Sequence, residues 1–139
     1  MSTKKAFAKP TASAKMRGCD KHGCGTFNAA RGNHSHQGED YIVAPGESVF
    51  SPISGTVTRF PRPYANDSDY TGIEIKNEKY DVKIFYMTPM VSIAKTVLAG
   101  DRIGIAQNIA AKYTPGMTNH IHVEVRDKAG TLLQILKLI

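Results

Sequence analysis

Short apolar stretches separated by turn residues run through most of the chain, and their polar and apolar positions alternate. A period of two places alternate side chains on opposite faces of a strand, and Gly, Pro, Asn and Asp at the breaks allow tight reversals. The pattern predicts strands over residues 41–44, 48–51, 55–60, 72–76, 82–87, 102–106 and 120–126. We therefore expect an all-β domain.

The segments outside these strands differ in character. Residues 61–72 form one long polar loop that could rim a site, and residues 130–139 could be a last strand or a short helix. Residues 1–16 are rich in Lys, Ala, Ser and Thr, which is typical of a flexible N-terminal tail. A length of 139 residues suits one domain, which we place at 17–139.

The composition excludes several classes of protein. The apolar runs are far shorter than the roughly 20 residues that cross a bilayer, so we expect no membrane span. The formal net charge of +6 favours anionic partners such as wall polymers, acidic lipids or nucleic acid. The cations are scattered, with no basic helix or basic patch interleaved with aromatics, so we expect no nucleic-acid partner. We also expect the protein to be a monomer.

The two cysteines, Cys19 and Cys24, enclose a short turn that contains Gly23 and His22. A zinc half-site usually has the tighter Cys-x-x-Cys spacing and a second pair, so a local disulfide is favoured. A disulfide indicates an oxidising, extracytoplasmic location, yet the N-terminus does not resemble a secretory signal. A shortened chain, a specialised export machine or thiols that stay reduced would each resolve the conflict. We expect His22 to be a surface turn residue.

Four of the five histidines lie in two clusters, "HSHQGED" at 34–40 and "HIHVEV" at 120–125. Alternation puts His120, His122, Glu124 and Arg126 on one face of a strand. His36 and Asp40 would lie about 13 Å apart in an extended chain, so they converge only if the backbone bends, which Gly38 permits. We expect His34 to be a loop or rim residue and Glu39 to face solvent, opposite Asp40.

Together the clusters offer nitrogen and oxygen ligands for a metal. Three such ligands with an open position describe a catalytic zinc site, where zinc lowers the pKa of bound water to about 7. His120 lies on the same face as His122 and could act as the base. A lone His-x-His is weak, and "HSH" at 34–36 alone would be compatible with a surface loop or a tag remnant, whereas the combination of the two clusters favours metal binding.

These motifs resemble the lysostaphin/LytM-type zinc endopeptidases. The resemblance rests on "HQGED" at 36–40, "APGESVFSPISGTV" at 44–57, "VLAGDRIGIA" at 97–106 and "HIHVEVRD" at 120–127. It implies a small antiparallel β-sheet fold with a zinc-binding groove and Zn²⁺ held by His36, Asp40 and His122. It also implies His120 as a catalytic residue and the peptides of bacterial peptidoglycan as substrate.

The front of the chain, "CDKHGCG" followed by "HQGED", resembles the leukocyte cell-derived chemotaxins. This second resemblance implies a disulfide between Cys19 and Cys24, a bound zinc and no established peptidase activity. Active peptidases of the first family carry a further histidine in a central strand, whereas this chain has "KIFYMTPM" there and no histidine between His36 and His120. Tyr86 could donate a hydrogen bond to the oxyanion, or could simply pack.

The sequence therefore predicts a zinc-dependent metalloendopeptidase that hydrolyses peptide bonds of bacterial peptidoglycan. Its partner is expected to be peptidoglycan peptides or another anionic wall polymer. It is expected to act outside the cytoplasm or to be delivered to another cell's wall. The alternative is a catalytically impaired, chemotaxin-like module that binds zinc and recognises a target without cutting it. A biotinyl or lipoyl carrier ranks last, because it lacks a suitably flanked lysine in a hairpin and leaves the histidines unexplained.

Overall fold

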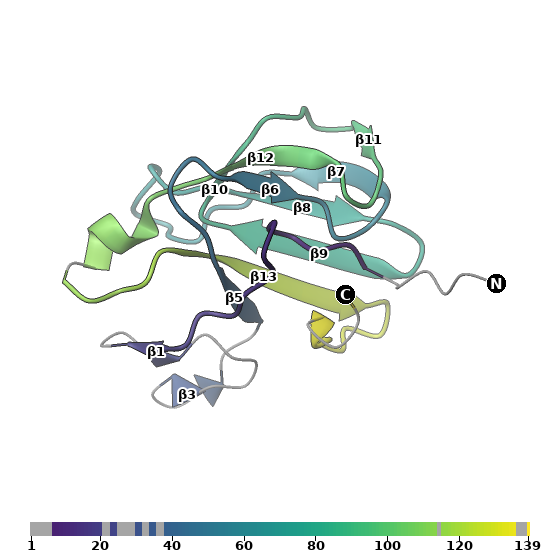
Figure 1. Cartoon of the computed structure of the whole chain (residues 1–139). Coiled ribbons are helices and arrows are strands. Elements are labelled where there is room, and N and C mark those ends of the chain that lie inside the picture. The colour runs from purple at the N-terminus through teal and green to yellow at the C-terminus, as the bar shows by residue number, and fades with distance from the viewer. Residues whose placement is uncertain are drawn as a thin grey trace.

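A computed structural model describes residues 7–20, 23–24, 30–31, 34–35, 38–113, 115–135 and 139. For residues 20, 23–24, 30–31 and 34–35 it describes the backbone but not the side chains. Two antiparallel sheets form the body of the domain (Figure 1). The larger has the order β11-β7-β8-β9-β13-β5 and consists of β5 (Glu39–Ile42), β7 (Gly55–Arg59), β8 (Gly72–Lys76), β9 (Tyr80–Phe85), β11 (Thr96–Val97) and β13 (His120–Asp127). The all-β antiparallel fold is confirmed.

The second sheet is smaller, and two short strand pairs lie outside both sheets. The three-stranded sheet has the order β10-β12-β6 and consists of β6 (Ser48–Phe50), β10 (Met87–Pro89) and β12 (Arg102–Ala106). The strand pairs are β1 (Cys19–Asp20) with β2 (Gly23–Cys24), and β3 (Ala30–Arg31) with β4 (His34–Ser35). Figure 1 shows these pairs beyond the β5 edge of the larger sheet. Ile109–Tyr113 form a 3-10 helix.

The core lies against the face of the larger sheet that carries the alternate apolar residues. Ile73, Ile84, Ile121 and Val123 are at most 2% exposed, and each fully buried side chain of this kind contributes roughly 1.5–3 kcal/mol. A slip of one residue in β13 would turn its apolar side chains to the polar face. The core therefore holds the register of β13 against both of its neighbours.

The seven predicted strands all occur, with one interrupted. Residues 82–87 span the end of β9 and the start of β10. Tyr86 lies between the two strands with a φ of 69°, in the left-handed region that a bulky residue seldom adopts. The predicted strand is therefore split at Tyr86, which alternation along the chain does not reveal.

The flexible tail predicted over residues 1–16 is wrong for residues 7–16. Phe7 is 3% exposed in the core, and its ring lies 4.8 Å from that of Tyr80. The amide of Ala8 donates to Pro52 O at 2.8 Å, and the amide of Phe50 donates to Pro10 O at 2.9 Å. Burial of one aromatic ring anchors a segment whose composition otherwise resembles a tail.

The end of the chain folds back on β13. Leu132 forms an isolated antiparallel bridge with Arg126, and the amide of Leu133 donates to Val125 O at 2.8 Å. Ile135 is 1% exposed. Residues 136–138 lie outside the described residues. Within the described residues no helix is long and apolar enough to cross a membrane.

The expectation that Glu39 faces solvent is wrong. Glu39 is 1% exposed and Tyr41 is 0% exposed, and the Tyr41 hydroxyl donates to Glu39 Oε1 at 3.3 Å. The register pairs Glu39 with Val123 and Tyr41 with Ile121. The face of β5 opposite Asp40 is thus the core face, because pairing with β13 places Glu39 and Tyr41 on the same side as the buried Val123 and Ile121.

Candidate active site

The pairing of β5 with β13 brings two of the three predicted metal ligands together. Asp40 lies directly opposite His122 in the antiparallel register, so their side chains share one face of the sheet. The two residues are 82 positions apart in sequence, and Asp40 Oδ1 lies 2.9 Å from His122 Nδ1. Asp40 is 2% exposed. A carboxylate oxygen and an imidazole nitrogen therefore meet at one point.

The second nitrogen of His122 has its own partner. His122 Nε2 lies 3.0 Å from Glu124 Oε1. Burial alone would lower the pKa of His122, but hydrogen bonds to Asp40 and Glu124 outweigh it and raise the pKa to about 9. The imidazole is thus protonated at both nitrogens when only carboxylates surround it. A metal that replaces the proton between Nδ1 and Asp40 would meet one N and one O ligand, which suits zinc.

His120 has the tautomer and the environment of a base. His120 Nδ1 lies 2.8 Å from Thr118 O, and because a carbonyl only accepts, Nδ1 carries the proton and Nε2 the lone pair. His120 Nε2 lies 3.5 Å from Asp40 Oδ2. Burial lowers the pKa of His120, against the attraction of Asp40. The lowered pKa favours the neutral ring, whose Nε2 faces the Asp40 carboxylate.

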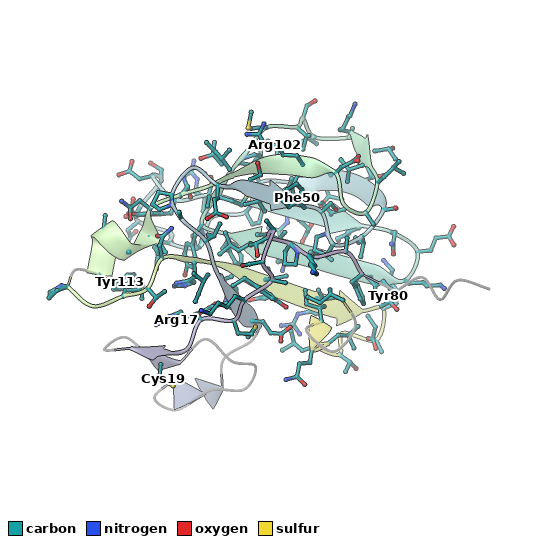
Figure 2. The ribbon with its side chains drawn as sticks, in the orientation of Figure 1. Arg17, Cys19, Phe50, Tyr80, Arg102 and Tyr113 are labelled. Carbon is teal, nitrogen blue, oxygen red and sulfur yellow. The ribbon has the colours of Figure 1, made fainter. Side chains whose placement is uncertain are left out.

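Arg17 is the charged neighbour of the site that the sequence analysis missed. Its Nη1 donates to Asp40 Oδ2 at 2.8 Å, and both side chains are 2% exposed. The segment before β1 pairs with β5, because the amide of Arg17 donates to Asp40 O at 2.8 Å and the amide of Ile42 donates to Lys15 O at 2.7 Å. Figure 2 shows Arg17 beside β5. The local pattern of charges and apolar residues around Arg17 carries no signal of this contact.

Tyr86 lies against His120 and belongs to a tyrosine cluster, which we define as Tyr64, Tyr70, Tyr86 and Tyr113. The rings of Tyr86 and His120 meet edge to face at 5.5 Å, and the Tyr64 and Tyr86 hydroxyls are 3.4 Å apart. Burial raises the pKa of Tyr86, with the hydrogen bond to Tyr64 opposing it. The phenol therefore keeps its proton and can donate it in a hydrogen bond.

The polar loop that could rim a site contacts a neighbour of His120, because the Tyr64 hydroxyl lies 3.4 Å from the Tyr86 hydroxyl. Tyr64 of this loop shares a 2.7 Å hydroxyl hydrogen bond with Tyr113 of the 3-10 helix, and Lys112 Nζ lies 2.7 Å from Asp67 Oδ2. Lys112 Nζ also lies 4.7 Å from the centre of the Tyr64 ring. Figure 2 places Tyr113 at the end of the domain where this helix lies. A hydrogen bond and an ion pair thus join the loop to the helix. Both segments lie next to Tyr86, which contacts His120.

Gly38 lies at a bend directly before β5, where the sequence analysis expects the backbone to bend, and its surroundings leave no room for a side chain. A Cβ at Gly38 would lie 2.4 Å from Val123 O and 3.0 Å from both Cε1 and Nε2 of His122. Glycine is needed because β13 and the His122 ring approach the backbone closely.

The remaining predicted residues lie wholly or partly outside the described residues. His36 and His22 are outside them, and for His34 only the backbone, in β4, is described. Among the described side chains no group of three or more metal-ligating residues occurs. Cys19 and Cys24 are direct partners in the β1-β2 pair.

Comparison with solved structures defines the class of fold. A zinc-containing peptidase from Vibrio cholerae superposes with a TM-score of 0.63 at 23% identity, covering 93% of this chain and 39% of that chain. The catalytic domain of the antimicrobial peptidase lysostaphin from Staphylococcus simulans superposes with a TM-score of 0.60 at 16% identity, covering 85% of this chain and 89% of that chain. The fold is that of the lysostaphin-type peptidases.

Sequence comparison finds relatives with a higher identity than these solved structures. Leukocyte cell-derived chemotaxin-2 of Bos taurus is 32% identical over 113 residues, which cover 81% of this chain and 74% of that protein. Residues 24–134 match the family described as "Domain of unknown function (DUF8155) N-terminal domain". The chain belongs to this family and is a relative of the leukocyte cell-derived chemotaxins. Both resemblances seen in the sequence are confirmed.

Proposed function

We propose that this protein is a zinc-dependent metalloendopeptidase that hydrolyses peptide bonds of bacterial peptidoglycan. The observation that carries the proposal is the cluster of Asp40, His122 and His120 on one sheet face of a lysostaphin-type fold. His36, at the HxxxD spacing before Asp40, is the third proposed ligand. Zinc, when bound, would polarise the scissile carbonyl and acidify a water molecule.

The chain's own residues supply the proton transfers. His120 Nε2 is unprotonated and faces the ligands, so it can accept a proton from the attacking water and return it to the leaving amine. The hydrogen bond from His120 Nδ1 to Thr118 O holds the ring in that orientation. Asp40 is fixed on its other side by Arg17, so its Oδ1 stays directed toward His122.

Tyr86 is the proposed donor to the tetrahedral oxyanion. Its phenol is protonated, lies beside His120 and occupies the stretch where active peptidases of the resembled family carry a histidine. Removing one oxyanion donor typically costs about 100- to 1000-fold in rate. A Tyr86→Phe variant that still binds zinc should therefore lose cleavage by about this factor.

A catalytically impaired, chemotaxin-like recognition module is the second candidate. It is favoured by the 32% identity with chemotaxin-2 and by the lack of any histidine between His36 and His120. Under this reading Asp40 and His122 hold a structural zinc, and the cationic surface recognises a wall component or another target. Both candidates have the same metal site, but only the peptidase hydrolyses peptide bonds.

The deciding experiment is a cleavage assay on purified peptidoglycan and on pentaglycine peptides with stoichiometric zinc. Wild type should release new amino termini, and His120→Ala should bind zinc equally well but release none above background. Zinc occupancy is measured by elemental analysis. A folded, zinc-loaded wild type that cleaves no peptidoglycan would exclude the peptidase and leave the recognition module.

The proposal also covers the cysteines, the site of action and the oligomeric state of the protein. We propose a disulfide between Cys19 and Cys24, supported by their direct pairing in β1-β2, and an extracytoplasmic site of action or delivery to another cell's wall. We also propose that the functional domain, predicted over residues 17–139, includes the packed residues 7–16 and acts as a monomer. Thiol titration of the denatured protein should find two reactive thiols only after reduction.

A further inference from the structure

The imidazole of His122 is held between two carboxylates on opposite sides of the ring. Asp40 Oδ1 lies 2.9 Å from Nδ1 and Glu124 Oε1 lies 3.0 Å from Nε2. Asp40 comes from the neighbouring strand β5, whereas Glu124 follows His122 by two residues in β13 itself. The two contacts use different nitrogens, so one nitrogen can bind a metal while the other keeps its hydrogen bond.

The geometry of strand β13 places Glu124 on the same face as His122. Residues two apart in a strand share a face, and the carboxylate of Glu124 can therefore reach the ring without leaving the sheet surface. Lys83 lies opposite Glu124 in β9, and its Nζ is also 3.9 Å from Glu74 Oε2. Glu124 thus belongs to a row of alternating charges across β8, β9 and β13.

The rest of the ring is enclosed as well. The backbone at Gly38 approaches the Cε1 and Nε2 edge so closely that a Cβ there would lie 3.0 Å from both atoms. The Phe85 ring, opposite His122 in β9, has its centre 6.0 Å from the imidazole centre. With packing from these neighbours and a fixed acceptor at Nε2, the ring is restrained in the orientation that directs Nδ1 at Asp40.

We propose that Glu124 is a positioning residue of the metal site. It accepts the hydrogen bond of His122 Nε2–H, fixes the tautomer with its lone pair on Nδ1, and so presents Nδ1 as the metal-binding atom beside Asp40. This inference rests on the proposed zinc site. Carboxylates placed behind ligand histidines orient the ring and make it a stronger ligand, and their loss typically weakens metal binding by about 10- to 100-fold.

The test is zinc affinity, measured by competition with a chromophoric chelator on the full chain at constant pH. Glu124→Ala should raise the zinc Kd by about 10- to 100-fold. Glu124→Gln keeps an acceptor oxygen of nearly the same shape and should recover part of that loss. Asp81→Asn is the matched control, because Asp81 is a carboxylate of the same sheet, opposite Arg126, and should leave the Kd within about twofold.

A second readout separates orientation from general structural damage. In zinc-loaded protein labelled with ¹⁵N-histidine, wild type should show His122 protonated at Nε2 alone, and Glu124→Ala should broaden or shift that signal. If wild type binds one zinc and Glu124→Ala has an unchanged Kd and spectrum, the positioning role is wrong while the zinc site stands. If folded wild type binds no zinc, the proposed function and this inference both fail.

Discussion

The close approach of Gly38 to β13 makes Gly38→Ala the sharpest test of the site geometry. The added Cβ would lie 2.4 Å from Val123 O, about 1 Å inside ordinary contact, and this oxygen belongs to a central strand that cannot easily retreat. The same Cβ would lie 3.0 Å from two atoms of the His122 ring. Overpacking of this kind typically costs about 1–3 kcal/mol.

The change should appear in both stability and metal binding. At about 4 °C per kcal/mol for a chain of this size, the melting temperature of the zinc-free protein should fall by about 4–12 °C. Because the ring of His122 must turn to make room, the zinc Kd should rise by at least about tenfold. Thermal melts followed by circular dichroism and chelator competition measure the two effects.

Gly18→Ala is the matched control. Nothing lies within 4 Å of a Cβ at Gly18, and its φ is not among the positive values, so stability should change by no more than about 0.5 kcal/mol. If Gly38→Ala melted and bound zinc like Gly18→Ala, the close packing of Gly38 against His122 would be refuted. A loss of zinc affinity without any loss of stability would also contradict the backbone clash.

Three further predictions concern the metal, the charged row and the tyrosine cluster. Adding zinc at 100 times its Kd should stabilise the protein by about 2.7 kcal/mol, and a chelator should reverse the gain in a thermal melt; unchanged melting would argue against a native-state site. Burial raises the pKa of Glu74, but hydrogen bonds from Arg59 and Thr58 outweigh it and lower the pKa, so the carboxylate stabilises the fold above its unfolded pKa of about 4.5 and loses that contribution as pH falls further. Glu74→Gln should therefore cost about 1 kcal/mol at pH 7, a low figure because Arg59 is 55% exposed, and progressively less as the pH falls below the unfolded pKa; a cost in urea melts that does not fall with pH would exclude the ion pair. Tyr113→Phe removes a 2.7 Å hydroxyl hydrogen bond and should cost about 0.5–1.5 kcal/mol while speeding amide exchange in residues 61–71; unchanged exchange would show that the bond does not hold the loop.

Much of the fold could be predicted because alternation is a local property. Apart from β5, which was expected two residues later at 41–44, each strand of the two main sheets that exceeds three residues was visible as an apolar-polar pattern bounded by turn residues. The face shared by His120, His122 and Glu124 followed from the same repeat. A period of two needs only neighbouring residues, so one strand reveals its own two faces without its partners.

The predictions failed where a long-range contact overrides a local pattern. Residues 7–16 have a tail-like composition, but burial of Phe7 and backbone hydrogen bonds to Phe50 and Pro52 anchor them. Glu39 alternates with Asp40, but which face of β5 meets the core depended on the pairing of β5 with β13, which sets Glu39 and Tyr41 beside the buried Val123 and Ile121. Tyr86 interrupts a continuous apolar run because its backbone turns left-handed.

The sequence by itself determined the strands, the face on which the histidines of β13 lie, and the residue types that suit zinc. The tertiary structure alone decided that Asp40 stands opposite His122, that Arg17 reaches the same carboxylate, and that Gly38 touches the imidazole. The reason is physical: alternation orders side chains within one strand, whereas the register between strands 82 residues apart is selected by burying the core of all of them together.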